Sequence, residues 1–300
     1  MPLGYYLAQG LIPLGPSSSD EEGGPCELPD GRIVCEPHGL DLMNEDDIAS
    51  EQRDQRKPYV DRMVPRKGTG KVFFSKFNPP SPTDTPLDLF SGRRRWRTEF
   101  MRMTHDVDPW TGIVFTDGAC FNNGQSNPKA AWAVHHGIFR NGQLVVDAGR
   151  LEMRGPFDDS IREQTSNRAE LRAIIAALRF HEWADESFRT LVIATDSSYA
   201  VEGATTWCRT WLRNGWRTSQ PGNPEVKNRD LWEALLGEAE RAHELGLNIE
   251  LWHIPRGLNT VADGAAKKVA VNYSAPEGWS EDFDAGINAE PYQFVLERHA

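Results

Sequence analysis

The sequence predicts an α/β domain in which helices flank a five-stranded mixed sheet, with elements in the order β-β-β-α-β-α-β-α. Two observations carry this prediction. Short runs rich in β-branched and aromatic residues recur from residue 109 onward, and stretches with apolar residues at helical spacing separate the later runs. Three strands followed by alternating helices and strands are typical of a sheet with helices packed on it.

The first three strands are predicted from short apolar runs in the first half of this domain. Residues 113–116 form a β-rich run that ends at an Asp-Gly pair, and residues 131–134 and 144–146 form two more. An Arg-Asn-Gly turn at residues 140–142 joins the second strand to the third. Because Asn and Gly suit tight turns, these two strands are expected to form a hairpin.

Helices and strands alternate in the second half of the domain. A helix is expected to begin near Ser166 or Asn167, either of which can cap it. Its buried stripe is formed by Leu171, Ile174, Ile175 and Leu178. Residues 191–194 are continuously apolar, as in a strand covered on both faces. The remaining elements are a long helix marked by Leu231, Leu235 and Ala239, a fifth strand at residues 249–252 and a last helix over residues 262–271.

Three regions of the chain differ in composition. Residues 1–105 are rich in Ser, Pro, Gly and charge and are predicted to be largely disordered, with short docked pieces at most. One such piece, residues 71–77, mixes bases with aromatics and is expected either to touch a nucleic acid or to pack on the domain. The Arg-rich run at 93–97 is expected to be a solvated linker or a nuclear signal. Residues 106–273 are predicted to form the folded domain, and residues 274–300 an acidic tail.

Composition indicates an intracellular protein, in the nucleus or the cytoplasm. No stretch of the 300 residues is apolar enough to span a membrane, and the start of the chain lacks the basic residues of a presequence. The four cysteines are scattered without paired zinc spacing, so reduced thiols are expected. A monomer is expected, and the sequence identifies no protein partner for the N-terminal extension.

The net charge of −11 argues at first against a nucleic-acid partner, but the charge is unevenly distributed. Before residue 50, ten acidic residues accompany one Arg, whereas residues 206–229 hold five basic residues and one Glu. Salt confines the field of each charge to about 8–10 Å. A local basic surface can therefore bind phosphates despite the acidic total.

Four acidic residues are placed at strand ends or helix starts: Asp117, Glu170, Asp196 and Asp263. Side chains at strand ends converge on one rim of a sheet, and Mg²⁺ prefers hard oxygen ligands. Each acid also has a structural explanation. Glu170 and Asp263 can complement a helix dipole, worth about 0.3–1 kcal/mol, and Asp196 can cap a helix. Four acids on one edge would nevertheless repel one another without a cation, so the pattern predicts a metal-dependent nuclease.

Several longer motifs surround these acids. They are Thr-Asp-Gly-Ala-Cys at residues 116–120, Thr-Ser-Asn-Arg-Ala-Glu-Leu at 165–171, Ala-Thr-Asp-Ser at 194–197, Gly-Trp-Arg-Thr at 215–218 and Val-Lys-Asn-Arg-Asp-Leu-Trp at 226–232. In this order they resemble the ribonuclease H type 1 family over residues 109–273, and the last two resemble the basic protrusion of its bacterial members. The resemblance implies a ribonuclease H-like fold. It also implies cleavage of the RNA strand of RNA–DNA hybrids, leaving 5′-phosphate and 3′-hydroxyl ends.

The resemblance further implies two Mg²⁺ ions, with Mn²⁺ as the alternative. Asp117 is expected to touch both ions, Glu170 and Asp196 to be divided between them, and Asp263 to hold the ion on the nucleophile side. Two ions about 3.5–4 Å apart can clamp both sides of a phosphodiester, one activating water and the other stabilising the leaving oxygen.

Contacts to the hybrid follow from the same resemblance. Cys120, Asn123, Asn167 and Glu170 match positions near the minor groove, where 2′-hydroxyls distinguish RNA from DNA. Thr165 and Ser166 are expected to bind a phosphate of the DNA strand at a helix N-terminus. In the protrusion, the expected contacts are Arg209, Arg213, Trp216, Arg217 and Lys227. Trp207 and Trp211 are one helical turn apart, and their rings are expected to pack rather than bind.

One segment departs from the family pattern. Many members carry a mobile His in the loop between the last strand and the last helix, but here that loop is short. His253 is expected to lie within the strand. Arg256 is better placed to meet the scissile phosphate as a cation, but an Arg cannot shuttle a proton near neutral pH. Slower turnover, not inactivity, is therefore expected.

Two other functions stay open. The chain can be a hybrid-binding protein with weak or absent cleavage, or a non-enzymatic adaptor whose acidic extension supplies the function. The intact set of acids disfavours both, whereas the altered loop keeps the first of them open. Integrases and exonucleases share the broader fold, but residues 216–232 point away from them.

Overall fold

The computed structural model describes residues 64–95 and 100–280 in full, and the backbone of four short strands before them. These strands, β1 (Ile12–Pro13), β2 (Pro25–Glu27), β3 (Ile33–Cys35) and β4 (Leu40–Asp41), form an antiparallel sheet in chain order. They belong to a compact unit, Met1–Asp61, distinct from the unit that begins at Arg62. Apart from these strands, the disorder predicted for residues 1–63 lies outside the described residues, as does most of the predicted tail.

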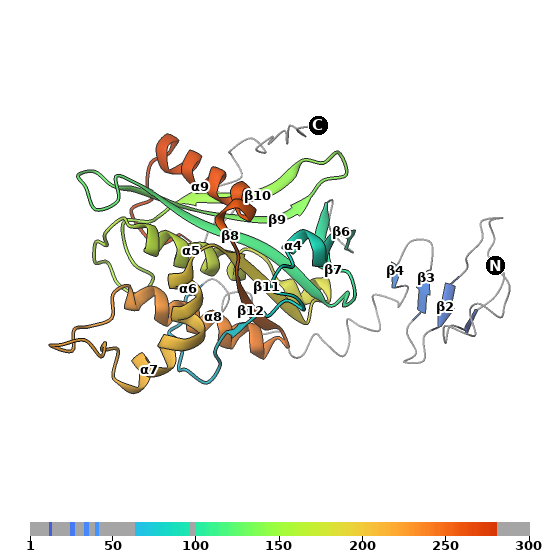
Figure 1. Cartoon of the computed structure of the whole chain (residues 1–300), viewed down its shortest axis with the longest axis horizontal. Helices are drawn as coiled ribbons and strands as arrows, with labels where there is room; N and C mark the ends of the chain where they lie inside the picture. Colours follow the sequence, from blue (N-terminus) through green and yellow to red (C-terminus); the bar gives the residue numbers. More distant parts are fainter. Residues whose placement is uncertain are drawn as a thin grey trace. The chain divides into compact units, whose positions relative to one another are not determined.

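The second unit is built on a mixed sheet of eight strands (Figure 1). Five of them are the strands that the sequence predicts: β8 (Thr111–Phe121), β9 (Lys129–Ile138), β10 (Leu144–Arg150), β11 (Thr190–Thr195) and β12 (Asn248–His253). β8, β9 and β10 pair antiparallel, and β11 pairs parallel with both β8 and β12. This parallel arrangement gives β8, β11 and β12 a common carboxyl edge.

The predicted domain boundary at residue 105 is wrong, because the preceding segment supplies the other three strands. β5 (Ser75–Lys76) extends the sheet beyond β12, β7 (Met101–His105) pairs with β8, and β6 (Phe90–Arg94) pairs with β7. The short helix α4 (Pro86–Leu89) leads into β6. Phe74 and Phe90 anchor this segment and are only 2% and 1% exposed. A polar average composition conceals such single apolar anchors, and short strands form only where a sheet edge receives them.

Two predictions for this segment can now be judged. Of the alternatives for residues 71–77, packing on the domain as a short strand is the one that the structure shows. The Arg run begins inside a strand rather than a linker, since Arg93 and Arg94 close β6, and the Arg95 guanidinium lies 4.3 Å from the Phe188 ring centre. Residues 96–99 lie outside the described part of the chain.

Helices cover both faces of the sheet. They are α5 (Ser166–Arg179), α6 (Ser198–Glu202), α7 (Cys208–Arg213), α8 (Arg229–Glu244) and α9 (Thr260–Asn272), with a π-helical turn (Gly203–Trp207) between α6 and α7. Alternation along β9 shows which helix lies where, because successive side chains point to opposite faces. Val134 joins the core with α5 and α8, while Ala133 packs against the alanines of α9. None of the helices in the described residues is long and apolar enough to cross a membrane.

The core around α5 also contains buried ion pairs. Three arginines of this helix each meet an acid that is at most 9% exposed: Arg168 with Asp230, Arg172 with Glu152, and Arg179 with Glu238. A fourth pair joins Arg102 of β7 to Glu186, which follows α5. Such pairs add little net stability over apolar packing, but removal of one partner leaves the other charge buried and uncompensated.

We predict that Glu186→Gln lowers the free energy of unfolding by about 3 kcal/mol at neutral pH. Burial opposes ionisation of Glu186, but hydrogen bonds from His181 and Arg102 outweigh it and lower its pKa to about 2. The ionised Glu186 therefore stabilises the fold above its ordinary pKa of 4.5, and this contribution is lost as pH falls toward 2. Denaturant titrations should show the difference between variant and wild type shrinking across that window.

The matched control is Asp185→Asn, because Asp185 is exposed on the same 3₁₀ helix as Glu186, Trp183–Glu186. Its effect should stay within about 0.5 kcal/mol. Equal losses in the two variants would contradict the role given to the buried pair.

Candidate active site

The four predicted acids gather at one cleft. Asp117 lies in β8, Asp196 directly follows β11, Glu170 lies in α5 and Asp263 lies in the first turn of α9. All four line a cavity of about 510 Å³. Elements far apart in the sequence therefore bring these carboxylates together as predicted, although Asp117 lies inside β8 and not at the end of the strand, where the sequence predicted it.

A glycine allows β8 and α5 to touch at this cleft. A Cβ atom built on Gly118 would lie 2.1 Å from the Glu170 nitrogen and 2.3 Å from the Ala169 carbonyl carbon. No side chain fits at that distance, so the two backbones are in direct contact. Asp117 and Glu170 are thereby held on either side of the crossing point. Glu170 is the fifth residue of α5, beyond the first turn, which weakens its explanation as a helix-dipole acid.

Two polar side chains that the sequence analysis did not select orient the acids. Asn259 is 1% exposed, and its Nδ2 donates to the Thr116 carbonyl at 3.0 Å and to Asp196 Oδ1 at 3.2 Å. Ser197 caps α6 and donates its hydroxyl to Glu170 Oε2. Because Ser197 is the cap, Asp196 is not needed as one. Only the positions of Asn259 and Ser197, each beside a helix start, could have indicated these roles.

Burial and mutual repulsion raise the pKa of two of the acids. The pKa of Asp117 is raised to about 8, first by burial and then by the negative charges of Asp196, Asp263 and Glu170. Burial also raises the pKa of Glu170, assisted by Asp196 and opposed by the Ser197 hydrogen bond. The four carboxylates line one cavity and lie close enough to repel one another.

Two cations offset part of this charge. Arg256 Nη2 donates to Asp263 Oδ1 at 3.0 Å, and Lys267 Nζ donates to Asp263 Oδ2 at 2.7 Å. Burial would raise the pKa of Asp263, but these donors lower it instead. Arg256, the predicted loop cation, also lies 3.9 Å from Asp196 Oδ2. Lys267 was not predicted, although its spacing four residues after Asp263 on a helix is typical of an ion pair.

His253 is the last residue of β12, so it lies within the strand as predicted. Its side chain is exposed, and Nε2 lies 3.3 Å from the carbonyl oxygen of Asp196. The ring thus contacts the backbone beside the acids without occupying the loop position of the family histidine.

The donor set fits a divalent cation in its chemistry. Four carboxylates supply the hard oxygens that Mg²⁺ and Mn²⁺ prefer. Burial, and then repulsion by the other three acids, raises the pKa of Asp117, and a bound cation would offset that repulsion. Within residues 64–95 and 100–280, however, no three His, Cys, Asp or Glu side chains already have the spacing of a metal-ligand group. Each oxygen of Asp263 accepts one hydrogen bond, from Arg256 or Lys267, so a bound ion would compete with these two cations for the carboxylate charge.

Several of the residues predicted to contact the hybrid line the same cleft. Cys120, Asn123 and Ser166 are part of its wall. The Ser166 backbone N–H donates to Asn123 Oδ1 at 3.4 Å, which ties the loop after β8 to the start of α5. Asn167 is exposed in the first turn of α5. The cap of α5 is Thr165, not Ser166 or Asn167 as predicted, because the helix begins one residue earlier and the Thr165 hydroxyl accepts from Arg168 N.

The protrusion residues have different environments. Arg209 and Arg213 on α7, and Arg217 and Lys227 in the following loop, are exposed as predicted. Trp216 is 6% exposed and packs in the main core, so the prediction that it contacts substrate is wrong. The backbone of Trp216, three residues after the end of α7, has a positive φ of 62° and so is not helical. Its ring packs into the core.

The rings of Trp207 and Trp211 pack as expected, since Trp207 contacts Tyr199 and Trp211 contacts Trp232. Trp207 nevertheless remains 38% exposed.

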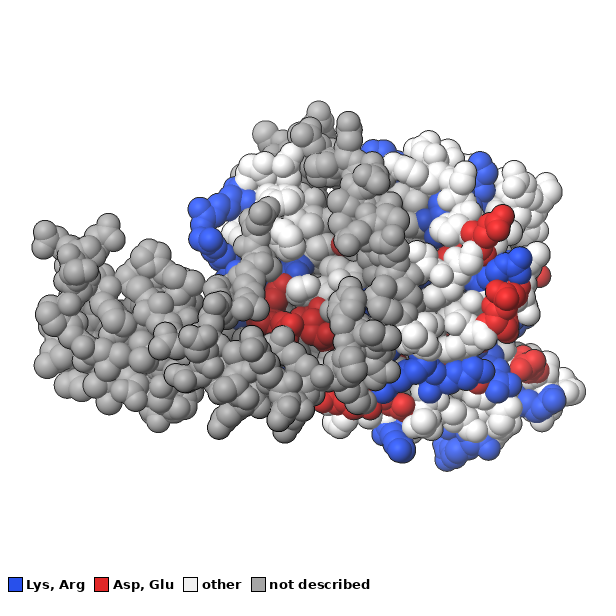
Figure 2. Space-filling view, turned by 180° about the vertical axis from the view of Figure 1, so that it is seen from behind, with Lys and Arg blue, Asp and Glu red and all other residues white. Residues whose placement is uncertain are grey.

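On the face shown in Figure 2, basic and acidic side chains are interspersed over the described surface, without one large field of either sign.

Comparison with known proteins gives a consistent assignment. The family model described as RNase H matches residues 111–271, more than half of the chain. A ribonuclease H of Neorickettsia sennetsu is 31% identical over 165 residues, covering 54% of this chain and 94% of that protein. Human ribonuclease H1 is 31% identical over 158 residues, covering 53% of this chain and about half (48%) of the human protein.

Among solved structures, RNase H1 from Halobacterium salinarum NRC-1 is 24% identical, covers 53% of this chain and 96% of that chain, and has a TM-score of 0.31. The fold and the acidic cleft define a nuclease of the ribonuclease H-like class. With the matched family model and relatives, the chain belongs to the RNase H family, in its type 1-like branch, and is a ribonuclease H enzyme.

We predict that Asp117→Asn stabilises the protein in EDTA at high pH. The pKa of Asp117 is about 8 in the folded protein and about 4 when unfolded, so folding becomes less favourable as pH rises through this window. The variant lacks this penalty. Its melting temperature should exceed that of wild type above about pH 8, and the two should converge below about pH 4. A constant difference at every pH would contradict the assignment.

We also predict that Gly118→Ala separates β8 from α5. The added methyl overlaps backbone atoms of Glu170, and overpacking of this kind costs typically 1–3 kcal/mol. Both the melting temperature and the affinity for Mn²⁺, measured by calorimetry, should fall. Gly257→Ala is the control, because a Cβ there meets no atom within 4 Å. A Gly118→Ala protein with unchanged Mn²⁺ affinity would contradict the role of the contact.

Proposed function

We propose that the chain is an endonuclease that hydrolyses the RNA strand of RNA–DNA hybrids with two divalent ions, Mg²⁺ or Mn²⁺. The products would carry 5′-phosphate and 3′-hydroxyl ends. The observation that carries the proposal is the set of four mutually repelling acids in one cleft, in which Asp117 is buried and has a pKa near 8. Its relatives, which are named ribonuclease H, support the same activity.

Each acid would act as a metal ligand, with Asp117 placed between the other three. When bound, the ions would activate a water for in-line attack and stabilise the leaving oxygen. The protein itself fixes the ligands beforehand. Asn259 holds the Asp196 carboxylate, and Ser197 holds that of Glu170. Preorganisation of this kind removes the cost of ordering charged groups as the reaction proceeds.

Arg256 and Lys267 are suited to a second role at the cleft. Both side chains are more than half exposed while they pair with Asp263, so each can move toward a phosphate oxygen. A guanidinium or ammonium there would stabilise negative charge on the scissile phosphate. Neither would shuttle a proton near neutral pH, which supports slower turnover than in family members with a loop histidine.

Substrate selection would come from the cleft wall and the protrusion. Cys120 and Asn123 line the cleft with the acids, where contacts to 2′-hydroxyls would distinguish RNA from DNA. Ser166, in the same cleft wall, would bind a phosphate of the DNA strand at the start of α5. The exposed arginines of the protrusion would bind phosphates of the backbone. Trp216 has no part in this, because its ring is in the core.

A hybrid-binding protein with weak cleavage is the second candidate. The observation that favours it is the ion pair of Asp263 with Arg256 and Lys267, which opposes ligation of an ion by that acid.

Cleavage assays separate the two candidates. The full chain, incubated with labelled RNA–DNA hybrid, RNA duplex or DNA duplex, should cut only the RNA strand of the hybrid in Mg²⁺ or Mn²⁺. It should cut nothing in EDTA. Asp117→Asn should reduce the rate by about 1,000-fold or more, because Asp117 has no substitute in the cleft. Fragments should be ligatable without prior phosphorylation if they carry 5′-phosphates.

Hybrid binding without cleavage in either ion would reject the nuclease proposal in favour of the second candidate. Cleavage that persists in Asp117→Asn would reject the assigned site.

A further inference from the structure

Residues 64–77, here called the strap, lie before the matched family region and run along α8. The Gly68 N–H donates to the Glu233 carbonyl at 2.8 Å. A Cβ on Gly68 would lie 2.4 Å from Leu236 Cβ, and one on Gly237 would lie 2.1 Å from the Arg66 carbonyl oxygen. Two glycines thus allow the strap backbone to rest directly on the helix.

Polar bonds fix the strap on both sides of Phe73. Glu240 Oε1 accepts hydrogen bonds from Thr69 N at 2.8 Å, Thr69 Oγ1 at 2.9 Å and Lys71 N at 3.1 Å. Beyond Phe73 the strap enters the sheet as β5, and Lys76 pairs with Glu202 of α6 at 2.5 Å. Phe73 is therefore presented from a backbone that is anchored at each end.

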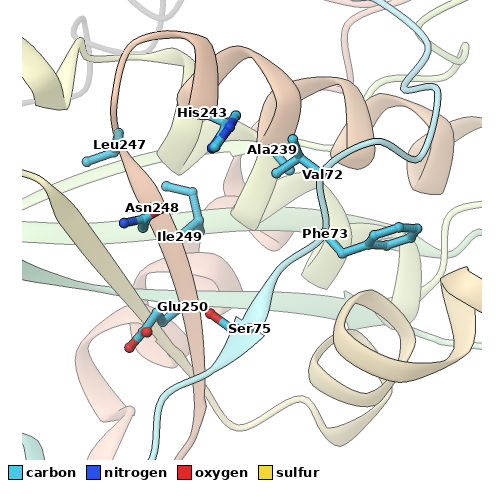
Figure 3. A pocket seen from close by; sticks show the side chains of 9 residues that line it. All are labelled: Val72, Phe73, Ser75, Ala239, His243, Leu247, Asn248, Ile249 and Glu250. Carbon is cyan, nitrogen blue, oxygen red and sulfur yellow. The ribbon is translucent and has the colours of Figure 1, made fainter.

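The side chain of Phe73 meets the protrusion. The Arg209 guanidinium carbon lies 4.1 Å from the Phe73 ring centre. Figure 3 shows the ring directed away from His243 and Asn248, which line a cavity of about 120 Å³ under the strap. Cys208 is the one residue of α7 that is buried, so lateral contacts such as this one define the position of the helix.

This cation–π contact uses none of the N–H donors of Arg209 in a hydrogen bond. A guanidinium held by its face on an aromatic ring keeps its N–H donors in the plane, where a phosphate can accept them. In the described part of the chain Arg209 has this ring as its partner and no carboxylate. Arg229 differs from Arg209, because its guanidinium already forms ion pairs with Glu225 and Glu233.

We propose that Phe73 is a positioning residue that holds Arg209 ready to bind a phosphate of the hybrid backbone. The strap then supports the substrate-binding surface through the contact of Phe73 with Arg209. This inference rests on the proposed function, since it assigns a residue outside the family region to binding of the same substrate.

The test is a double-mutant cycle on the full chain, with Phe73→Leu, Arg209→Ala and the double variant. KM and the dissociation constant for the hybrid should rise about two- to fivefold in Phe73→Leu, with kcat unchanged. Arg209→Ala should also reduce the slope of log affinity against log salt by about 1. In the Arg209→Ala background, Phe73→Leu should have no further effect, because the two residues act as one unit.

Phe73→Tyr keeps the aromatic face and should bind like wild type, which separates stacking from mere packing. Melting temperatures identify any variant that has lost its fold, and the Tyr variant keeps the comparison valid in that case. If the two single changes multiply in their effects on the dissociation constant, or if Phe73→Leu binds the hybrid as tightly as wild type, this inference is overturned while the proposed function stands. A wild-type chain that does not bind the hybrid would overturn the proposed function as well.

Discussion

The contact between β8 and α5 at Gly118 is the constraint on which the site depends. Asp117 belongs to a strand and Glu170 to a helix that begins 45 residues after that strand ends. They can share a cleft only if the two backbones approach more closely than side chains normally permit, and Gly118 provides that approach. Parallel pairing of β11 with β8 then brings Asp196 to the same edge. Asn259 donates hydrogen bonds to the Thr116 carbonyl of β8 and to Asp196, and Asp263 follows in the first turn of α9.

The electrostatics of the cleft are unequal across the four acids. Asp117 is buried among negative charges and has a strongly raised pKa, whereas Asp263 is half-buried between Arg256 and Lys267 and has a lowered one. A cation would therefore gain most near Asp117, and would have to compete for Asp263. This difference gives each acid a distinct relation to a divalent ion, although all four line one cavity.

The N-terminal segment is more closely integrated with the domain than its composition indicates. It adds strands to the sheet, packs Gly68 against α8 and contacts the protrusion through Phe73. Residues before position 111, where the match to the RNase H family begins, thus pack against elements inside the matched region. In that sense the second unit, which begins at Arg62, is larger than the catalytic core that its motifs define.

The sequence by itself determined the order of the five central strands, the main helices and the identity of the four acids. These depend on local periodicity and on motifs, which a sequence carries directly. Only the tertiary structure decided which residues surround the acids. Asn259, Ser197 and Lys267 are ordinary polar residues until folding brings them within hydrogen-bonding distance of a carboxylate. Trp216 looks like a binding residue until its ring is found in the core, and β5 forms only because β12 offers it an edge. Contacts between distant segments have no local signal, because they depend on how the elements pack together.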